Sequence, residues 1–312
     1  MNKIDARNPS RALDATGRKV IKLEELVVDK NKREDNSFGT RNASSHSEKI
    51  RARALNEKFR LPEESASMKV LAFNASPLME KGNTSLILMP FLDGMREEGC
   101  RVELSYTCRL RVKPCLGDRA CWTKTPGKCV QDDDVKMLLP RIREADVIVF
   151  GTPVYVDGMP GTLKNLIDRL IPIVEPHFVM HDRHCRHPPR KPHKHSKVVL
   201  VSNCGFWEMD NFEPLVTHVQ AICKNTSWEF AGALLRPHGE ALGYMIRKGI
   251  PVQDVLDAAK NAGKELVQTG KISEENMKIV SRSLVPLETY VEMTNKGFKQ
   301  ALDRLGKTKG SD

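Results

Sequence analysis

Apolar residues follow two different periods along the chain from Met68 onward. Short, continuous apolar runs end at polar loops, a pattern typical of strands that are buried on both faces of a parallel sheet. These runs cover residues 69–76, 145–155 and 198–205. A further strand is predicted at 228–237, and the polar–apolar alternation of 101–106 indicates a less buried edge strand.

Helical spacing of apolar residues separates the strands. The predicted helices cover residues 84–99, 132–145, 161–174 and 211–225, and an amphipathic helical region runs from 251 to 305. Three aspartates at 132–134 suit a helix start, because the helix dipole stabilises negative charge there. Strands that alternate with helices predict an α/β fold, a doubly wound parallel sheet of five strands with right-handed crossovers.

The composition changes along the chain and predicts three parts. Residues 1–66 are rich in charged residues, Asn and Ser, and we expect a flexible N-terminal extension. Residues 67–245 would form the α/β domain, and residues 246–312 a helical C-terminal extension.

Bulk composition excludes several classes of protein. Of the 312 residues, 40% are hydrophobic and 29% are charged, a globular balance, and no apolar run approaches 18 residues. The first residues lack the apolar core of a signal peptide, so we expect a cytoplasmic protein without a membrane partner. Eight cysteines are too few for a disulfide scaffold in a chain of this length, which favours thiol or metal roles.

The net charge of +10 does not by itself indicate a nucleic-acid partner, because basic residues are mixed with acidic ones. The run RHCRHPPRKPHKHSK at 183–197 is basic throughout. It carries no interleaved aromatic residues that could stack on bases. We therefore expect no nucleic-acid partner.

The loop that follows the first strand carries the groups that a phosphate needs. Open parallel sheets bind ligands beyond the carboxyl ends of their strands. Hydroxyls, an amide and backbone N–H groups at a helix start suit a phosphate, and a capped helix after a polar turn is the alternative. The candidates are Ser76, Gly82, Asn83, Thr84 and Ser85. The loop is neither G-x-G-x-x-G nor G-x-x-x-x-G-K-[ST], so a dinucleotide fingerprint and a P-loop are both absent from this position.

The loop at 152–162 is stiffened by two prolines and two glycines and includes Pro153, Val154 and Tyr155. A fixed backbone beside a helix start suits a flat heteroaromatic ring on which negative charge develops. A plain strand–helix connection has the same composition and is the alternative.

A third loop follows the strand at 198–205 and holds Asn203, Cys204 and Gly205. Phe206 and Trp207 come next and could cover a ring, or they could pack in the core, as aromatic residues usually do. Because the carboxyl ends of parallel strands share one edge, we expect the three loops to converge there.

The stretch KPCLGDRACWTKTPGKC at 113–129 raises the question of a metal. Cys115, Cys121 and Cys129 have the spacing of an iron–sulfur site, but Asp118 stands at the second ligand place. Clusters prefer thiolates, although one carboxylate among three thiolates is chemically feasible. Alternatives are a contribution from Cys108, zinc on the same side chains, and thiols that pack as small hydrophobes. Our interpretation is a metal-free loop or a degenerate cluster site.

Taken together, three motifs resemble those of the flavodoxin-like NADPH-dependent FMN reductase superfamily, in its iron–sulfur flavoprotein branch. They are the SP…KGNTS loop, the cysteine loop running into DDD, and TPVY…LKNLIDR at 152–169; the resemblance covers about residues 68 to 240. It implies a five-stranded sheet of order 2-1-3-4-5. It also implies that Ser76, Asn83, Thr84 and Ser85 hold the FMN phosphate, that Pro153, Val154 and Tyr155 border the isoalloxazine, and that Asn203, Cys204 and Gly205 flank its other side.

The resemblance further implies an FMN-dependent NAD(P)H oxidoreductase that passes electrons to a quinone, a flavin or another small acceptor. Members of the branch hold a [4Fe–4S] cluster on four cysteines, and the superfamily forms dimers or tetramers with the flavin near the subunit boundary. The alternatives are a flavodoxin-type electron carrier that works with ferredoxin, and a binding protein that has lost its flavin. Flavin chemistry needs no side chain as acid or base, so we assign no catalytic residue; Tyr155 is the best candidate to touch substrate.

The segment HDRHCRHPPRKPHKH at 181–195 gathers five of the nine histidines and Cys185. A soft metal on His181, His184, Cys185 and His187 is one interpretation. The prolines favour the other, an extended surface flap beside the flavin.

Overall fold

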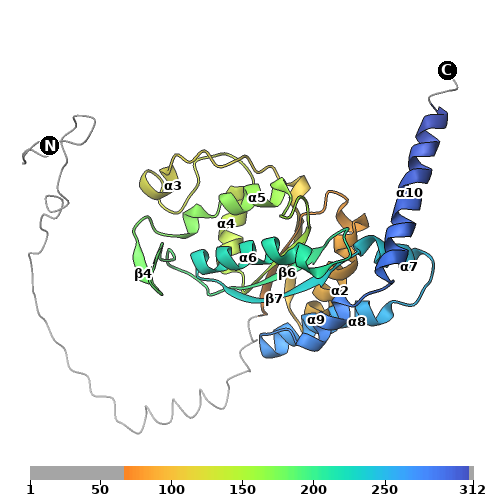
Figure 1. Ribbon diagram of the computed structural model, residues 1–312. Helices are drawn as coiled ribbons and strands as arrows, with labels where there is room; N and C mark the ends of the chain where they lie inside the picture. The colour runs from red at the N-terminus through yellow and green to blue at the C-terminus, as the bar shows by residue number, and fades with distance from the viewer. Residues whose placement is uncertain (1–66, 309–312) are drawn as a thin grey trace, which may run out of the picture. The chain divides into compact units, whose positions relative to one another are not determined.

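The computed structural model describes residues 67–308 (Figure 1), so the predicted N-terminal extension lies outside the described residues. Its centre is a five-stranded parallel sheet. The strands are β1 (Lys69–Asn74), β2 (Arg101–Tyr106), β3 (Val147–Pro153), β6 (Lys197–Asn203) and β7 (Glu229–Arg236). They lie in the order β2-β1-β3-β6-β7, which is 2-1-3-4-5 when only the strands of this sheet are counted. The predicted fold class and strand order are confirmed.

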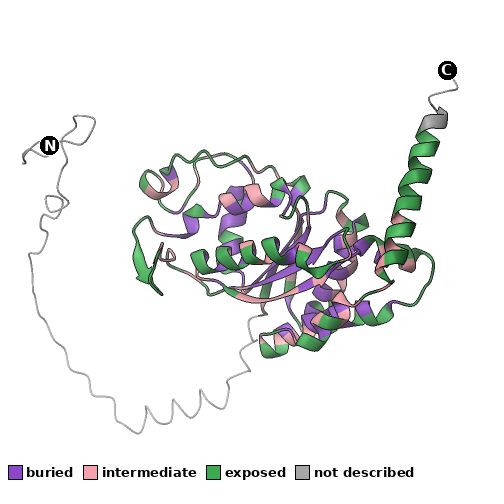
Figure 2. Cartoon of the chain, in the orientation of Figure 1, coloured by how far each residue is buried: buried purple, intermediate pink, exposed green. Residues whose placement is uncertain are grey.

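Helices cover both faces of the sheet. One face carries α2 (Asn83–Glu97), α8 (Gln253–Thr269) and α9 (Glu274–Ser281); the other carries α4 (Val135–Glu144), α5 (Gly161–Asp168) and α6 (Glu213–Thr226). Alternate residues of each strand enter opposite cores: Leu71 and Phe73 lie in one cluster, Val70 and Ala72 in the other. The central strands are buried on both faces (Figure 2), which explains their continuous apolar sequence.

Strand β2 pairs only with β1 within the described sheet, and most of its residues are half-buried. The predicted edge strand is therefore confirmed. The helix predicted at 161–174 is shorter than expected: α5 ends at Asp168, and a 3-10 turn at Ile171–Ile173 holds Pro172. A proline lacks the N–H that a longer α5 would need there.

Three further features were not predicted. Helix α7 (Gly239–Arg247) follows β7 closely. The histidine-rich segment contains a small antiparallel hairpin of β4 (Val179–His181) and β5 (His184–Arg186). A one-turn helix, α3 (Ala120–Thr123), lies inside the cysteine loop.

The region after residue 246 has two kinds of helix. Helix α8 places Val255, Ala259 and Leu266 in the core against α2. Helix α10 (Leu287–Thr308) instead runs away from the sheet and is exposed along most of its length (Figures 1 and 2). The division at residue 246 stays a prediction. Within residues 67–308, no helix has the length and apolarity needed to cross a bilayer.

Glycines bring α2 and α8 into backbone contact. A Cβ on Gly94 would lie 2.0 Å from the carbonyl oxygen of Lys260, and a Cβ on Gly263 would lie 2.0 Å from the carbonyl oxygen of Phe91. Real Cβ atoms do not approach backbone so closely, so a methyl group at either position would force the two helices apart.

We expect Gly263→Ala to lower the free energy of unfolding by about 1–3 kcal/mol, the cost of overpacking. Urea unfolding of the full chain measures the change. Gly161→Ala is the matched control, because no atom lies within 4 Å of a Cβ at Gly161 and helical Gly→Ala is neutral or stabilising by up to about 1 kcal/mol. Equal stabilities of the two variants would contradict the close contact of α2 with α8.

Candidate functional site

The loop between β1 and α2 is held by a buried amide. Asn74 donates from Nδ2 to Ser85 Oγ over 2.9 Å, and its Oδ1 accepts the backbone N–H of Ser76 over 2.9 Å. Ser85 Oγ in turn donates to the carbonyl of Met79 over 2.7 Å. Asn74 was not among the predicted site residues, although it is the last residue of the buried strand. It fixes the position of the whole loop.

Gly82 allows the loop to fold tightly onto the start of α2. A Cβ at Gly82 would lie 2.2 Å from Ser76 Oγ, so only glycine fits while the serine keeps this place. No side chain caps the first turn of α2. The N–H of Ser85 donates to the carbonyl of Gly82 over 3.0 Å. The N–H groups of Asn83 and Thr84 lie beside the hydroxyls of Ser76, Thr84 and Ser85, a donor set that fits a phosphate.

Asn203 joins the three loops at the carboxyl edge of the sheet. Thr84 Oγ1, from the first loop, donates to Asn203 Oδ1 over 2.6 Å, and Val154 N, from the second, donates to the Asn203 carbonyl over 2.9 Å. Helix α7 begins against the same residue, because a Cβ at Gly239 would lie 3.2 Å from the Asn203 side chain. The predicted convergence of the three loops is therefore present.

The second loop makes a tight turn that projects into solvent. The backbones of Tyr155 and Gly158 exchange two hydrogen bonds of 2.8 and 3.1 Å. Between them, Val156 has a φ of 46° and is 99% exposed, and Asp157 has a φ of 60°. A β-branched residue rarely adopts positive φ, and such strain concentrates at binding sites. The turn offers the half-exposed Tyr155 ring and the Val156 side chain to a ligand.

The third loop combines a buried thiol with an exposed ring. Burial raises the pKa of the Cys204 thiol, and its Sγ donates to the Phe206 carbonyl over 3.3 Å. Cys204 is therefore a neutral structural thiol at neutral pH. The ring of Phe206 is exposed, whereas Trp207 donates from Nε1 to the carbonyl of Val285 over 3.0 Å. Of these two rings, Phe206 is the one that can cover a ligand.

A buried arginine lies directly behind the third loop. Arg236, at the end of β7, donates to the carbonyls of Pro237 (2.8 Å), Val280 (2.7 Å) and Arg282 (2.6 Å). These carbonyls include the C-terminus of α9, so the guanidinium occupies the negative end of that helix dipole. Burial lowers the pKa of Arg236 to about 10, which leaves it charged at neutral pH. No sequence pattern marks this role.

His238 connects the same loop to the start of α10. Burial, followed by the neighbouring Arg236 charge, lowers its pKa to about 4, so the imidazole is neutral. Its Nε2 accepts from the N–H of Leu284 over 3.1 Å. The ring lies between Trp207 and Tyr290, with centroids 6.0 and 5.6 Å away.

The cysteine loop lines a cavity of about 610 Å³. Cys115, Cys121, Cys129 and Asp118 all line it. Burial, with the nearby sulfurs of Cys129 and Cys115, raises the pKa of Cys121, and Asp118 Oδ1 accepts the N–H of Ala120 over 3.0 Å.

Three thiols and a carboxylate suit a cluster chemically. Among residues 67–308, no three His, Cys, Asp or Glu side chains are arranged to hold a metal, in this loop or in the histidine-rich hairpin. Phe178, before the hairpin, and His187, after it, line the cysteine cavity, and the His187 ring lies 4.7 Å from that of Trp122. Whether Cys115, Cys121 and Cys129 bind a metal stays a prediction.

Arg169 holds the two ends of the cysteine loop together. It donates from Nη1 to the carbonyl of Lys113 over 2.7 Å and from Nη2 to Cys129 Sγ over 3.1 Å. The same guanidinium pairs with Asp133 through bonds of 2.7 and 3.1 Å, and both side chains are 1% exposed. Burial alone would raise the pKa of Asp133, but Arg169 and the hydrogen bonds from the backbone N–H groups of Lys113 and Val135 together lower it.

The aspartates at 132–134 therefore do more than start a helix. Helix α4 begins at Val135 without a side-chain cap from Asp134, and Asp132 pairs with Lys136 at the surface. Asp133 accepts the Val135 N–H over 3.2 Å and is the buried partner of Arg169. The sequence predicted a helix start at these aspartates but not the buried pair between Asp133 and Arg169.

Comparison of the sequence with known proteins identifies the family to which the chain is similar. Residues 68–205 match the family described as NADPH-dependent FMN reductase. An iron–sulfur flavoprotein of Archaeoglobus fulgidus is 31% identical over 229 residues, which cover 72% of this chain and 92% of the relative. One from Methanocaldococcus jannaschii is 40% identical over 106 residues, 34% of this chain and 53% of the relative.

The match to the Methanocaldococcus protein and that to a second Archaeoglobus protein each span about half of the relative's length. Among solved structures, an azoreductase from Bacillus anthracis has a TM-score of 0.49 at 17% identity, over 64% of this chain and 99% of the azoreductase. The Archaeoglobus relative that aligns over nearly its whole length carries the assignment. The chain thus belongs to the NADPH-dependent FMN reductase superfamily, in the branch of the iron–sulfur flavoproteins.

Proposed function

We propose that the chain is an FMN-dependent oxidoreductase that takes electrons from NADH or NADPH and passes them to a small acceptor such as a quinone or a flavin. The observation that carries the proposal is the junction at Asn203. Its side chain and carbonyl join the Thr84 loop and the Val154 loop over 2.6 and 2.9 Å, beside the uncapped start of α2. The loops proposed for the phosphate and for the ring thereby share one edge of the sheet.

In this proposal Ser76, Asn83, Thr84 and Ser85 hold the FMN phosphate. The Ser76 hydroxyl and the N–H groups of Asn83 and Thr84 would donate to it, and the helix dipole favours its negative charge. The hydroxyls of Thr84 and Ser85, which donate to Asn203 and Met79 in the structure, would have to turn toward the phosphate. Gly82 contributes by leaving space for Ser76.

Pro153, Val154 and Tyr155 would border the isoalloxazine, and Asn203, Cys204 and Gly205 would flank its other side. When bound, FMN supplies the redox chemistry, hydride acceptance from nicotinamide and electron delivery to the acceptor. The chain orients the ring and limits access of water with the exposed side chains of the second and third loops. No side chain needs to move a proton, so Tyr155 is assigned a contact with substrate and no acid–base role.

The test of this activity uses the full chain loaded with FMN. We expect NADPH or NADH to be oxidised only when a quinone or a flavin is added, as followed by nicotinamide absorbance.

The alternative is a flavodoxin-type carrier that works with ferredoxin. It is favoured by the apolar side chains exposed around the site, since Val156 is 99% and Phe206 68% exposed, which suits a docking protein. Reduction by ferredoxin without any nicotinamide oxidation would select that alternative.

A charge placed in the phosphate site tests the binding residues directly. Asn83→Asp keeps the size of the side chain and is expected to weaken FMN binding at least about fivefold, because two negative charges at 4 Å repel by about 1–4 kcal/mol. Isothermal titration with FMN measures the change. Asn225→Asp is the control, since Asn225 is exposed in the last turn of α6, at the opposite edge of the sheet. Equal FMN affinities of the two variants would exclude a phosphate at the start of α2.

We also propose a cytoplasmic location and a homo-oligomer.

A further inference from the structure

Helix α7 packs against the start of α2 at a glycine. A Cβ at Gly243 would lie 2.9 Å from Asn83 Oδ1, in the first turn of α2, so a side chain there would push the amide aside. Gly243 and its neighbour Leu242 are both buried, so this approach of the two helices is part of the packed domain. The glycine leaves a space beside the loop that is proposed to hold the FMN phosphate.

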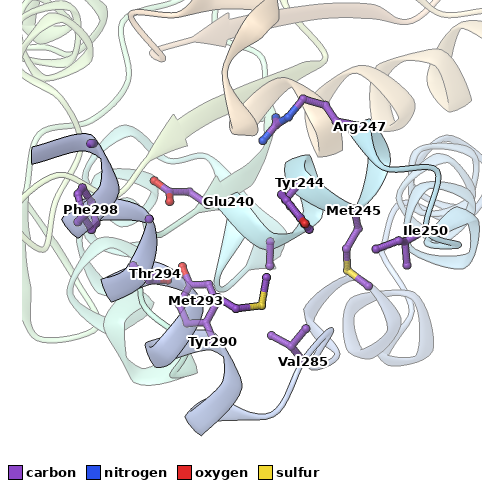
Figure 3. A pocket seen from close by; sticks show the side chains of 13 residues that line it. Glu240, Tyr244, Met245, Arg247, Ile250, Val285, Tyr290, Met293, Thr294 and Phe298 are labelled. Carbon is purple, nitrogen blue, oxygen red and sulfur yellow. The ribbon is translucent and has the colours of Figure 1, made fainter. Parts of the chain in front are cut away.

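The guanidinium of Arg247 lies at the same space. Its Nη1 is 3.2 Å from the position that a Cβ of Gly243 would take. Arg247 Nη1 and Asn83 Oδ1 are therefore at most about 6.1 Å apart, the sum of the two distances. In Figure 3 the Arg247 side chain extends from α7 beside the pale orange ribbon that includes α2, at the edge of an apolar groove of about 570 Å³ between α7 and α10.

Both side chains are unpaired. Within residues 67–308, neither the Arg247 guanidinium nor the Asn83 amide has a hydrogen-bond or ion-pair partner. An arginine in the last turn of a helix is usually explained by the helix dipole, but Arg247 reaches back one turn to Gly243 instead. The unpaired cation and the unpaired amide thus lie together beside the uncapped start of α2.

We propose that Arg247 is a phosphate-binding residue of the FMN site and reaches the phosphate from α7. The inference rests on the proposed function, because it requires FMN at the start of α2. The loop between β1 and α2 supplies donors that carry no net charge, namely hydroxyls and N–H groups. A guanidinium adds hydrogen bonds assisted by its charge, which are shorter and stronger than bonds between neutral groups.

A second cation, Lys81, lies in the phosphate loop itself. It ends the short 3-10 turn Met79–Lys81 and is exposed. Arg247 is the stronger candidate because its guanidinium already lies at the start of α2, in a space that Gly243 leaves open. The experiment below compares the two residues.

The test is the FMN affinity of the full chain, measured by flavin fluorescence for the wild type and three variants that each lose one positive charge. Arg247→Gln is expected to weaken FMN binding about tenfold, and Lys81→Gln is expected to weaken it less. Lys248→Gln is the matched control, because Lys248 is the next residue and its ammonium lies over the Tyr244 ring, 5.9 Å from the centroid. Its FMN affinity is expected to stay within about twofold of the wild type.

The dependence of FMN affinity on salt separates a charge contact from a structural role. Salt screens interactions between exposed charges, so the wild-type affinity is expected to fall as sodium chloride is added. The affinity of Arg247→Gln is expected to fall less steeply. A purely structural role of Arg247 would lower the affinity without changing its dependence on salt.

Gly243→Ala tests the space rather than the charge. The new methyl group would displace the ends of the Asn83 and Arg247 side chains, and we expect weaker FMN binding although no charge is lost. Alanine is favoured over glycine inside a helix, so the thermal transition of this variant should not fall.

The proposal is overturned if Arg247→Gln binds FMN as tightly as the wild type, or if Lys81→Gln or Lys248→Gln loses as much affinity. In those cases tight FMN binding by the wild type would leave the proposed function standing, whereas a wild type without FMN binding would overturn both. Far-UV circular dichroism and a cooperative thermal transition of Arg247→Gln show that its lost affinity is not lost fold.

Discussion

Replacing Arg169 with methionine is expected to lower the free energy of unfolding by about 3–5 kcal/mol. The change leaves the Asp133 carboxylate, 1% exposed, without its bidentate partner. It also frees both ends of the cysteine loop, because the same guanidinium holds the Lys113 carbonyl and the Cys129 sulfur. Urea unfolding measures the first effect, and faster alkylation of Cys129 in the native protein measures the second.

The stability that Arg169→Met loses is expected to depend on pH and to shrink as the pH falls. Folding lowers the pKa of Asp133, so the pair contributes its stability above the ordinary aspartate pKa of about 3.9 and loses it as the pH falls further. The stabilities of the wild type and Arg169→Met should therefore converge in acid.

Arg111→Met is the matched control for Arg169→Met. It removes an arginine from the neighbouring aspartate, Asp134, where the arginine side chain is 86% exposed. Surface pairs of this kind contribute at most about 1 kcal/mol. If both variants lost the same small amount of stability, the buried pair between Arg169 and Asp133 would not exist in solution.

Replacing Arg236 with methionine is expected to cost at least about 3 kcal/mol of unfolding free energy, since each buried acceptor left without a donor costs about 1–3 kcal/mol. The carbonyls of Pro237, Val280 and Arg282 would all lose their donor. Because these bonds join β7 to the end of α9, amide hydrogen exchange in α9 should also become faster.

The control for this second change is Arg282→Met. Arg282 pairs with Asp254 at the surface, with side chains 38% and 50% exposed, so its loss is expected to cost less than about 1 kcal/mol. An Arg236→Met protein as stable as Arg282→Met would contradict the assignment of Arg236 as the donor at the end of α9.

The strands of the sheet were predictable from local sequence patterns, whereas their order came from the resemblance to the family. Central strands such as Val147–Pro153 are covered on both faces and read as unbroken apolar runs. Helix α7 was missed because it follows β7 after two residues, with His238 in a left-handed conformation and no side-chain cap to signal the start. The helix predicted to residue 174 was too long because apolar spacing continues past Asp168, where the backbone no longer follows.

The candidate site likewise has parts that the sequence predicted and parts that it did not. Its loops were identifiable because each follows a buried strand, and parallel topology brings strand ends to one edge. Arg169 and Asp133 lie 36 residues apart and Arg236 and Val280 lie 44 apart, so no local pattern links them. In most sequences a lone arginine, or an aspartate just before a helix, lies at the surface. The structure is needed to show that Arg169, Asp133 and Arg236 are buried.

Titration of the full chain with FMN and with riboflavin, followed by flavin fluorescence, tests the phosphate site most directly. The two ligands differ only in the phosphate that the hydroxyls and N–H groups at the start of α2 are proposed to hold. We expect micromolar or tighter binding of FMN and at least about 100-fold weaker binding of riboflavin, since hydrogen bonds to a charged group contribute about 1.5–3 kcal/mol each. Equal affinities for the two ligands, or no saturable binding of FMN, would contradict a phosphate site at the start of α2.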